Sequence, residues 1–256
     1  YFLLPVPDAY RASTLLSCLL AAVGAFTLGR RLNFSRAGAL VAGLAFALSG
    51  YVVSMTDNIV YLYSVCALPL FCAGIEKALV ASRAWAVAPA VVWATVFLIG
   101  DVQTGYYYLF IAFLWALTRA PRSRRDACLR LFLVGGLTFL LACVQLGPAA
   151  VVFVNSPRMQ PAQFHEQALY WSAHPLRLAT VLAAPVGENA DPVDVGRVFF
   201  GNRPMDGRGG PWTASLYLGV PIAGLAFLGA WHRRDLLVLA LLGGFALLLA
   251  LGRYGG

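Results

Sequence analysis

The sequence predicts an all-α polytopic membrane protein that crosses a bilayer about eight times. Three observations support this fold class: 60% of the 256 residues are hydrophobic, only 12% are charged, and the mean hydropathy is +0.74. Soluble domains carry about 25% charged residues. A soluble fold of this length could not bury so much apolar surface, whereas runs of about 20 apolar residues cross a bilayer as helices.

Apolar runs follow one another along the chain and define the predicted elements. Each run is expected to be helical, because backbone groups in lipid must form their hydrogen bonds within their own segment. In chain order the predicted membrane helices are residues 12–29, 37–56, 59–80, 84–100, 105–119, 130–153, 213–231 and 236–252. We expect these helices and their connections to form a single membrane domain over residues 1–256.

The connections alternate in charge, which gives the crossings a direction. Cytoplasmic loops of membrane proteins are enriched in Lys and Arg. One set of connections holds Arg30, Arg31 and Arg36, then Lys77 and Arg83, then the arginines between 119 and 130, then Arg233 and Arg234. The opposite set holds Asp8, Asp57, Asp101 and the acidic residues of 155–211. The first set is therefore predicted to face the cytoplasm and the second set the outside.

The connection 155–211 is the one long stretch outside the predicted helices, and connections of this length are usually functional or disordered. Its Pro, Gly, Asn and Asp content argues against a globular core. Inside it, residues 175–186 are apolar but too short to span, so we expect a helix that lies in the outer interface or dips partway into the membrane. Because the chain begins with Tyr1 and ends directly after an apolar run, we also expect a piece of a longer protein.

Polar residues at the predicted outer ends of the helices are candidates for chemistry, since polar groups at membrane depth are costly. One cluster contains Asp57 and Asn58, and another contains Asp101 and Gln103. Asp57 and Asp101 are predicted catalytic carboxylates, acting as a base or as a partner for sugar hydroxyls. Asn58 and Gln103 are predicted to bind substrate. The alternative is that each Asp only caps a helix or closes a turn at the water boundary.

The long connection adds cations and acid–base groups near the predicted membrane surface. The substrate-binding candidates there are Arg158, His165, Glu166, His174 and Arg177. Because Arg forms paired hydrogen bonds with phosphate, Arg158 and Arg177 are predicted to hold a lipid phosphate. Ordinary solvated loop charges are the alternative interpretation for each of them.

Nothing in the sequence requires a metal ion or a cofactor. The five cysteines lie in or beside apolar runs, without CxxC or Cys/His spacing. Asp191 and Asp194 could approach a divalent cation, but two carboxylates make an incomplete site. The net charge of +8 comes mainly from Arg clusters between apolar runs, a placement typical of membrane topology and not of nucleic-acid binding.

Several stretches, in this order, carry a resemblance to a known family: LPVPDAYRASTLL with LGRRLNFSRAGALVAGLAFALSGYVVS, LIGDVQTGYYYLF, QLGPAAVVFVNSPR, WSAHPLRLATVLAAPVGE, FFGN followed by SLYLGVPIAGLAFLG, and LLALGRYGG. The series, spread over nearly the whole chain, resembles the YfhO family of bacterial membrane proteins, within the broader GT-C type of membrane glycosyltransferases. The resemblance implies transfer of a sugar from a polyprenyl-phosphate donor to an acceptor glycan or lipid on the outer face of the cytoplasmic membrane.

The resemblance has two departures. GT-C enzymes place their main catalytic Asp or Glu in the first external loop, which the resemblance puts upstream of Tyr1. Where the family commonly has Gly-His-Pro-Gln, this chain has Gly100, Asp101, Val102 and Gln103. Gly100 and Gln103 therefore match the family pattern, whereas the second position differs.

Two other functions remain open at the level of sequence. A lipid or small-molecule transporter would place charges along a pathway within the membrane. Here the middle of nearly every predicted helix is uncharged and the polar candidates gather on one side. A noncatalytic assembly subunit would use the same helices without an outer pocket.

Overall fold

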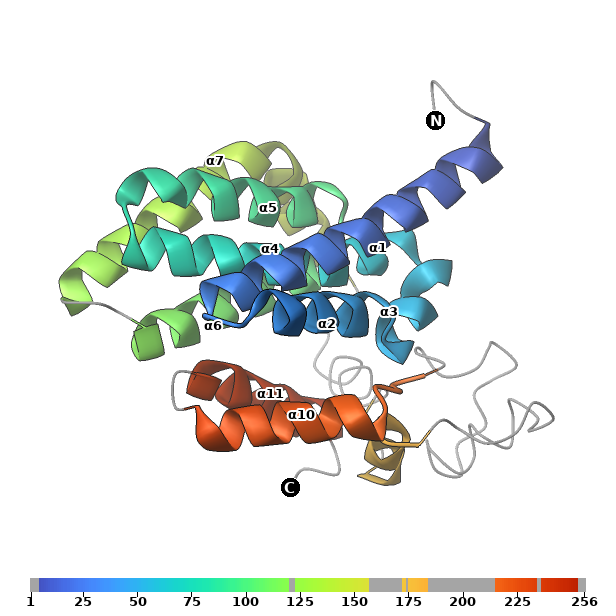
Figure 1. Cartoon of the computed structure of the whole chain (residues 1–256). Coiled ribbons are helices and arrows are strands. Elements are labelled where there is room, and N and C mark those ends of the chain that lie inside the picture. The colour runs from blue at the N-terminus through green and yellow to red at the C-terminus, as the bar shows by residue number, and fades with distance from the viewer. Residues whose placement is uncertain are drawn as a thin grey trace. The chain divides into compact units, whose positions relative to one another are not determined.

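The computed structural model describes residues 5–119, 123–156, 172–173, 175–183, 215–233 and 236–252. Within these residues all regular secondary structure is helical, as Figure 1 shows, which confirms the predicted all-α class. The chain divides into two compact units, unit 1 (Tyr1–Leu48 and Met55–Ala149) and unit 2 (Ser49–Ser54 and Ala150–Gly256). Whether the whole chain is a single membrane domain stays a prediction.

Every predicted membrane segment contains a helix, although the bounds differ. The helices of unit 1 are α1 (Val6–Arg31), α2 (Arg36–Ala47), η1 (Met55–Asp57), α4 (Ile59–Val80), η2 (Arg83–Ala86), α5 (Val87–Leu98), α6 (Val102–Arg119) and most of α7 (Arg124–Val154). The described helices of unit 2 are α3 (Gly50–Ser54), η4 (Pro175–Val181), α10 (Val220–His232) and α11 (Leu237–Leu251). The helix predicted over 37–56 is divided among α2, α3 and η1.

Four helical stretches in the described part of the chain are long and apolar enough to cross a membrane: Val6–Arg31, Arg36–Asp57, Ile59–Val80 and Arg124–Val154. They correspond to the first, second, third and sixth predicted crossings. The other four crossings and the external position of 155–211, most of which lies outside the described residues, stay predictions.

Within unit 1, α1 and α4 run in the same direction. The Tyr10 hydroxyl, near the start of α1, donates to the Thr56 carbonyl just before α4. Two turns before its end, α1 passes close to α4 at Gly24, where an added Cβ would lie 2.9 Å from the Leu70 amide nitrogen. A turn with Asn33 at φ 60° then reverses the chain into α2.

Helix α5 runs antiparallel to α4. The hydroxyls of Tyr63, near the start of α4, and Thr95, near the end of α5, lie 2.8 Å apart. At the other end of the pair, Gly74 of α4 faces Pro89 of α5, where an added Cβ would lie 3.0 Å from the proline Cδ. The small residue Gly74 thus allows close packing at one end of the pair, and a polar contact joins the two helices at the other end.

Helix α6 runs parallel to α4, and α7 returns antiparallel to it. Tyr108 of α6 donates to the Ser64 carbonyl of α4 at 2.6 Å. Further along both helices, Trp115 of α6 donates to Glu76 of α4 at 2.6 Å. Arg130, near the start of α7, contacts the last turn of α4. Successive long helices of unit 1 therefore alternate in direction.

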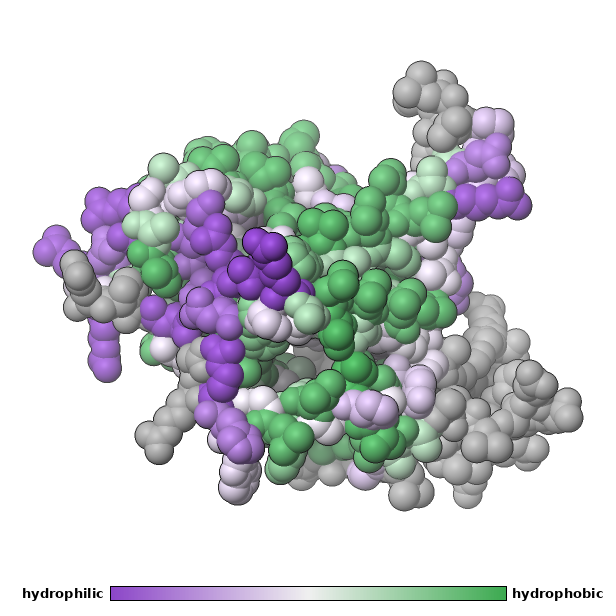
Figure 2. All heavy atoms as spheres, in the orientation of Figure 1, coloured by the Kyte–Doolittle hydropathy of each residue, from purple (hydrophilic) through white to green (hydrophobic). Residues whose placement is uncertain are grey.

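This alternation separates the charges of unit 1 into two ends. The basic end holds Arg30, Arg31, Arg36, Lys77, Arg83, Arg119, Arg124, Arg125 and Arg130; the acidic end holds Asp8, Asp57 and Asp101. In Figure 2, hydrophilic side chains gather on the left, at the basic end, and at the N-terminal end of α1, with hydrophobic surface between them. The grouping agrees with the predicted alternation, while the side of the membrane that each end faces stays a prediction.

In unit 2, residues 215–219 are extended and lie against α3. The Gly50 amide donates to the Tyr217 carbonyl at 2.7 Å, and the Ser215 amide donates to Ser54 Oγ at 2.8 Å. A Cβ on Gly50 would collide with the Ser215 side chain and lie 2.7 Å from the Tyr217 nitrogen. The predicted helix 213–231 therefore begins only at Val220, because the residues before it pair with a distant segment.

Candidate functional site

Asp101 lies at the acidic end of unit 1, in the short connection between α5 and α6. Gly100, with φ 98°, ends the preceding helix in a conformation that favours glycine. The Asp101 Oδ1 atom accepts a hydrogen bond from the Thr104 amide at 3.0 Å and so caps the N-terminus of α6. The capping role considered from the sequence is therefore confirmed for one oxygen of this carboxylate.

The second oxygen of Asp101 has no such structural role. The residue is only 3% exposed, and Oδ2 is buried without a hydrogen-bond partner. In the described part of the chain, the other buried side-chain oxygen in this condition is Thr14 Oγ1. A buried polar atom without a partner costs about 1–3 kcal/mol. A carboxylate oxygen held in this state is available to a hydrogen-bond donor that enters the site.

Aromatic residues fix the helix that carries Asp101. Trp93 of α5 donates its indole N–H to the Gly105 carbonyl in the first turn of α6 at 2.9 Å. Tyr108, which is fully buried, ties the second turn of α6 to α4 through Ser64. Its ring also stacks on Phe71, with centroids 4.5 Å apart. Sequence reasoning missed these contacts, since aromatic residues inside apolar helices carry no distinguishing pattern.

Asp57 and Asn58 lie at the same end of unit 1 but in a different environment. Asp57 closes η1 and is exposed, and Asn58 precedes α4 without a side-chain capping bond. Asp57 is thus open to solvent, whereas Asn58 is half-buried. Their roles as catalytic and substrate-binding residues stay predictions.

Gln103 is exposed in the first turn of α6, where its amide donates to the Tyr107 hydroxyl at 2.9 Å. The three consecutive tyrosines of this helix do not act together: Tyr106 is 60% exposed and Tyr107 44%, whereas Tyr108 is buried. The first two side chains lie on the exposed surface of α6, and the third belongs to the core.

Most of the candidates in the long connection cannot be placed. Arg158, His165, Glu166 and His174 lie outside the described residues, and so does the side chain of Arg177. The backbone of Arg177 is part of η4, a 3₁₀ helix inside the predicted interfacial segment 175–186. The Val181 carbonyl at the end of η4 accepts hydrogen bonds from the amides of Leu218 and Gly219. The position of η4 in an interface stays a prediction.

At the basic end, buried charge is fully paired. Glu76 is 5% exposed and accepts from Trp115 Nε1 at 2.6 Å and from Arg119 Nη2 at 2.6 Å. These partners come from α6, about 40 residues further along the chain. Glu76 thus has partners on both oxygens, unlike Asp101.

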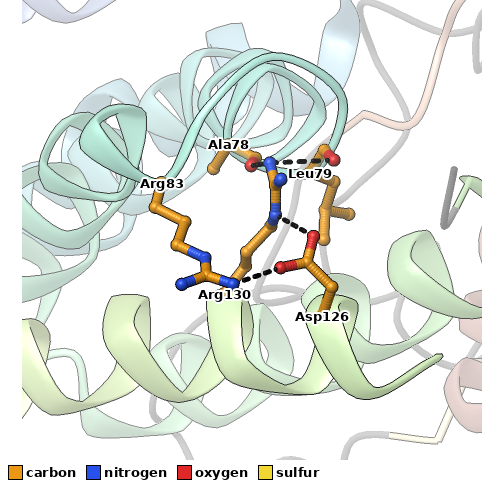
Figure 3. A network of polar contacts seen from close by, with 5 residues as sticks. All are labelled: Ala78, Leu79, Arg83, Asp126 and Arg130. Atoms are coloured by element: carbon orange, nitrogen blue, oxygen red, sulfur yellow. Dashed lines mark hydrogen bonds and ion pairs between the residues drawn. The ribbon is translucent and has the colours of Figure 1, made fainter. Parts of the chain in front are cut away.

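A second paired network lies beside it, as Figure 3 shows. Asp126 accepts from Arg83 Nη2 at 2.8 Å and from Arg130 Nε at 2.6 Å. Arg130 also donates to the carbonyls of Ala78 and Leu79, which end α4, at 2.7 and 3.2 Å. The network joins α4, η2 and α7 and satisfies helix-terminal carbonyls that lack an internal partner.

No metal site emerges among the residues that the structure describes, because no group of three His, Cys, Asp or Glu side chains converges there. The cysteines are all free, with Cys66 and Cys72 buried in α4. The expectation that no cofactor is required is untested by this arrangement.

Residues 4–181 match the family described as "Bacterial membrane protein YfhO". The chain belongs to the YfhO family. The matched stretch contains every predicted site residue, from Asp57 to Arg177. Together with its apolar helices, the family places this protein in a membrane. No curated protein and no solved structure matches the chain.

Proposed function

We propose that this YfhO-family protein is a GT-C type membrane glycosyltransferase. It moves a sugar from a polyprenyl-phosphate donor to an acceptor glycan or lipid on the outer face of the bacterial cytoplasmic membrane. The observation that carries the proposal is the buried carboxylate of Asp101, which has one oxygen engaged in the scaffold and the other without a partner. Family membership suggests a glycosyltransferase-like role and supports the same conclusion.

The chemistry requires one carboxylate and one site for a departing phosphate. Asp101 Oδ2 accepts the proton of an acceptor hydroxyl or orients that hydroxyl. The hydroxyl oxygen then forms a bond to the anomeric carbon of the sugar, while the bond between that carbon and the lipid-phosphate oxygen breaks. The electron pair leaves with the phosphate, whose growing charge Arg158 or Arg177 stabilises. Asp57, Asn58 and Gln103 contact sugar or acceptor at the open surface.

The distribution of charge favours this function over a transporter. A transporter would carry ionisable residues along a pathway through the membrane. In the described helices of unit 1, charged side chains lie in the first or last turns or within two turns of an end, and the middle of each helix is uncharged. Asp101 lies at such an end, where a substrate in the headgroup layer could reach it.

The test replaces Asp101 by Asn in the full-length protein. Asparagine caps a helix as well as aspartate does, so the Asp101→Asn variant keeps the bond to the Thr104 amide. It loses the basic oxygen, and we expect the rate of sugar transfer from a polyprenyl-phosphate donor in membranes to fall about a hundred-fold or more. Thermal unfolding, followed in parallel, should be nearly unchanged.

Asp8→Asn is the matched control, because Asp8 is an exposed carboxylate at the same end that pairs only with Arg11. Its transfer rate should equal that of the wild type. Asp57→Asn should lower the rate less than Asp101→Asn does, since Asp57 is exposed to solvent. Unchanged turnover in Asp101→Asn would reject Asp101 as the reacting carboxylate.

A further inference from the structure

The cations at the basic end of unit 1 fall into three groups: those paired with an acid, those near the meeting of α1, α2 and α4, and Arg124 with Arg125 at the start of α7. Arg83, Arg119 and Arg130 are paired with Glu76 or Asp126. The second group, Arg30, Arg31, Arg36 and Lys77, has no ion pair with an acidic residue in the described part of the chain. The described acids are Asp8, Asp57, Asp101, Glu76 and Asp126: the first three lie at the acidic end, and the other two are engaged by the first group. The second group therefore carries positive charge that the described chain does not neutralise.

The second group gathers where α1, α2 and α4 meet. Arg30 donates from Nη1 to the Phe34 carbonyl at 2.6 Å, which holds its guanidinium against the turn into α2. Arg31 and Arg36 flank that turn and are exposed. Lys77 lies in the last turn of α4, at the same end of unit 1. Like charges gathered at one end repel one another, and an anionic partner offsets that repulsion.

The surroundings of Lys77 indicate the kind of anion. Its ammonium nitrogen lies 2.9 Å from the centre of the Trp85 ring. Trp85 is 43% exposed, and the apolar side chains of Leu40, Val80 and Val87 on the adjoining helices are exposed as well. Tryptophan favours the headgroup layer of a bilayer. An anion that meets both the cations and this apolar border has an acidic head and hydrocarbon tails, which a free phosphate lacks.

We propose that Arg30, Arg31, Arg36 and Lys77 form a headgroup surface that binds an anionic phospholipid. The guanidinium groups hold the phosphate through paired hydrogen bonds, and the acyl chains lie along the exposed apolar side chains of α2, α4 and η2. The surface lies at the end of unit 1 opposite Asp101, so it is independent of the proposed transfer reaction. It stabilises the helix ends at one leaflet.

The experiment measures lipid binding by the purified full chain in a neutral detergent. Phosphatidylglycerol or phosphatidylcholine is titrated in, and the lipids retained on the protein are counted by native mass spectrometry. Wild-type protein should prefer phosphatidylglycerol. The double variant Arg30→Gln, Arg31→Gln should bind phosphatidylglycerol about 25-fold more weakly, since each basic residue near an anionic lipid contributes about five-fold. Its affinity for phosphatidylcholine should not change.

Two control variants locate the effect. Arg11→Gln, an exposed arginine at the acidic end, should retain the wild-type affinity. Arg124→Gln, Arg125→Gln removes the same charge from α7 at the basic end, and its affinity should fall much less. Equal losses in both double variants would show only a general attraction to the basic end and would overturn the proposed surface. An undiminished preference for phosphatidylglycerol in the double variant Arg30→Gln, Arg31→Gln would also overturn the proposed surface.

A variant that keeps the charge guards against loss of folding. Arg30→Lys, Arg31→Lys should recover most of the affinity, because the positive charge remains although the guanidinium fork is lost. Raising the salt concentration should weaken phosphatidylglycerol binding by wild-type protein and leave phosphatidylcholine binding unaffected. Binding of phosphatidylglycerol that is insensitive to salt would contradict the proposal without any variant.

Discussion

The two ends of unit 1 differ in how their carboxylates are paired. At the basic end, Glu76 and Asp126 each accept hydrogen bonds on both oxygens from arginines or a tryptophan. At the acidic end, Asp101 is more deeply buried than either of them, yet one of its oxygens has no partner. The basic end pairs both oxygens of its carboxylates within the chain, whereas the acidic end leaves a carboxylate oxygen unpaired.

This difference distinguishes carboxylates that stabilise the fold from carboxylates that are available for chemistry. A buried carboxylate with arginine partners fixes helices to one another. Removing one partner lowers the stability, because the remaining charge stays buried without compensation. A buried carboxylate that caps a helix with one oxygen and leaves the other unpaired costs stability, and folds keep such costs mainly where function uses them. Variants at the two ends can test this contrast directly.

The largest effect on stability should come from removing a partner of Glu76, so that this carboxylate, like Asp101, lacks part of its pairing. Arg119→Met removes the cation and leaves Glu76 buried without its ion pair, so we expect a loss of about 3–5 kcal/mol in the free energy of unfolding. Unfolding in mixed micelles with increasing SDS would measure it. The double variant Glu76→Gln, Arg119→Met should recover much of the loss, because no buried charge then lacks a partner. Equal losses in single and double variants would mean that packing, and not charge pairing, stabilises this end.

An intermediate effect is expected at the acidic end from Gly105→Ala. The added Cβ would collide with the ring of Phe97, which is itself buried in α5. Overpacking of this kind costs about 1–3 kcal/mol, and the same unfolding assay would detect it. Gly136→Ala in α7 is the matched control, since nothing lies within 4 Å of the new Cβ. That variant should gain up to about 1 kcal/mol from helix propensity. An unchanged free energy of unfolding in Gly105→Ala would show that α5 and α6 pack loosely around the site.

The last comparison concerns the two arginines that share Asp126, and the smallest loss of stability is expected for the more exposed one. Arg130 is 15% exposed and also bonds two α4 carbonyls, so Arg130→Gln should cost about 1–3 kcal/mol. Arg83 is 56% exposed, and Arg83→Gln should cost less than about 1 kcal/mol. The Arg83 effect should shrink further in high salt, which a repeat of the unfolding series would show. The reverse order would contradict the view that burial sets the strength of each pair.

Much of the helical layout of this protein could be predicted from its sequence. Each predicted segment contains a helix, because long apolar runs and the charged residues that bound them are local features. The break of 37–56 into α2, α3 and η1 could not be predicted. It accompanies the contacts of Gly50 and Ser54 with residues 215–217, about 160 positions away.

The candidate site could be predicted only in part from the sequence. Asp57 and Asp101 were both plausible carboxylates at the ends of predicted helices, and both carried the same capping alternative. Packing separates them, because α5 and α6 enclose Asp101 while η1 leaves Asp57 exposed. The tyrosines at 106–108 are separated in the same way, since the helical turn directs only Tyr108 toward Ser64 of α4.

The sequence alone determined that this is an all-helical membrane protein of the YfhO family, with cations at one set of helix ends and aspartates at the other. Hydropathy and charge act through solvent and lipid, so they can be read residue by residue along the chain. Only the tertiary structure decided which carboxylates are paired. Pairing requires side chains from α4, α6 and α7 to meet within about 3 Å, and that proximity arises only when the helices pack.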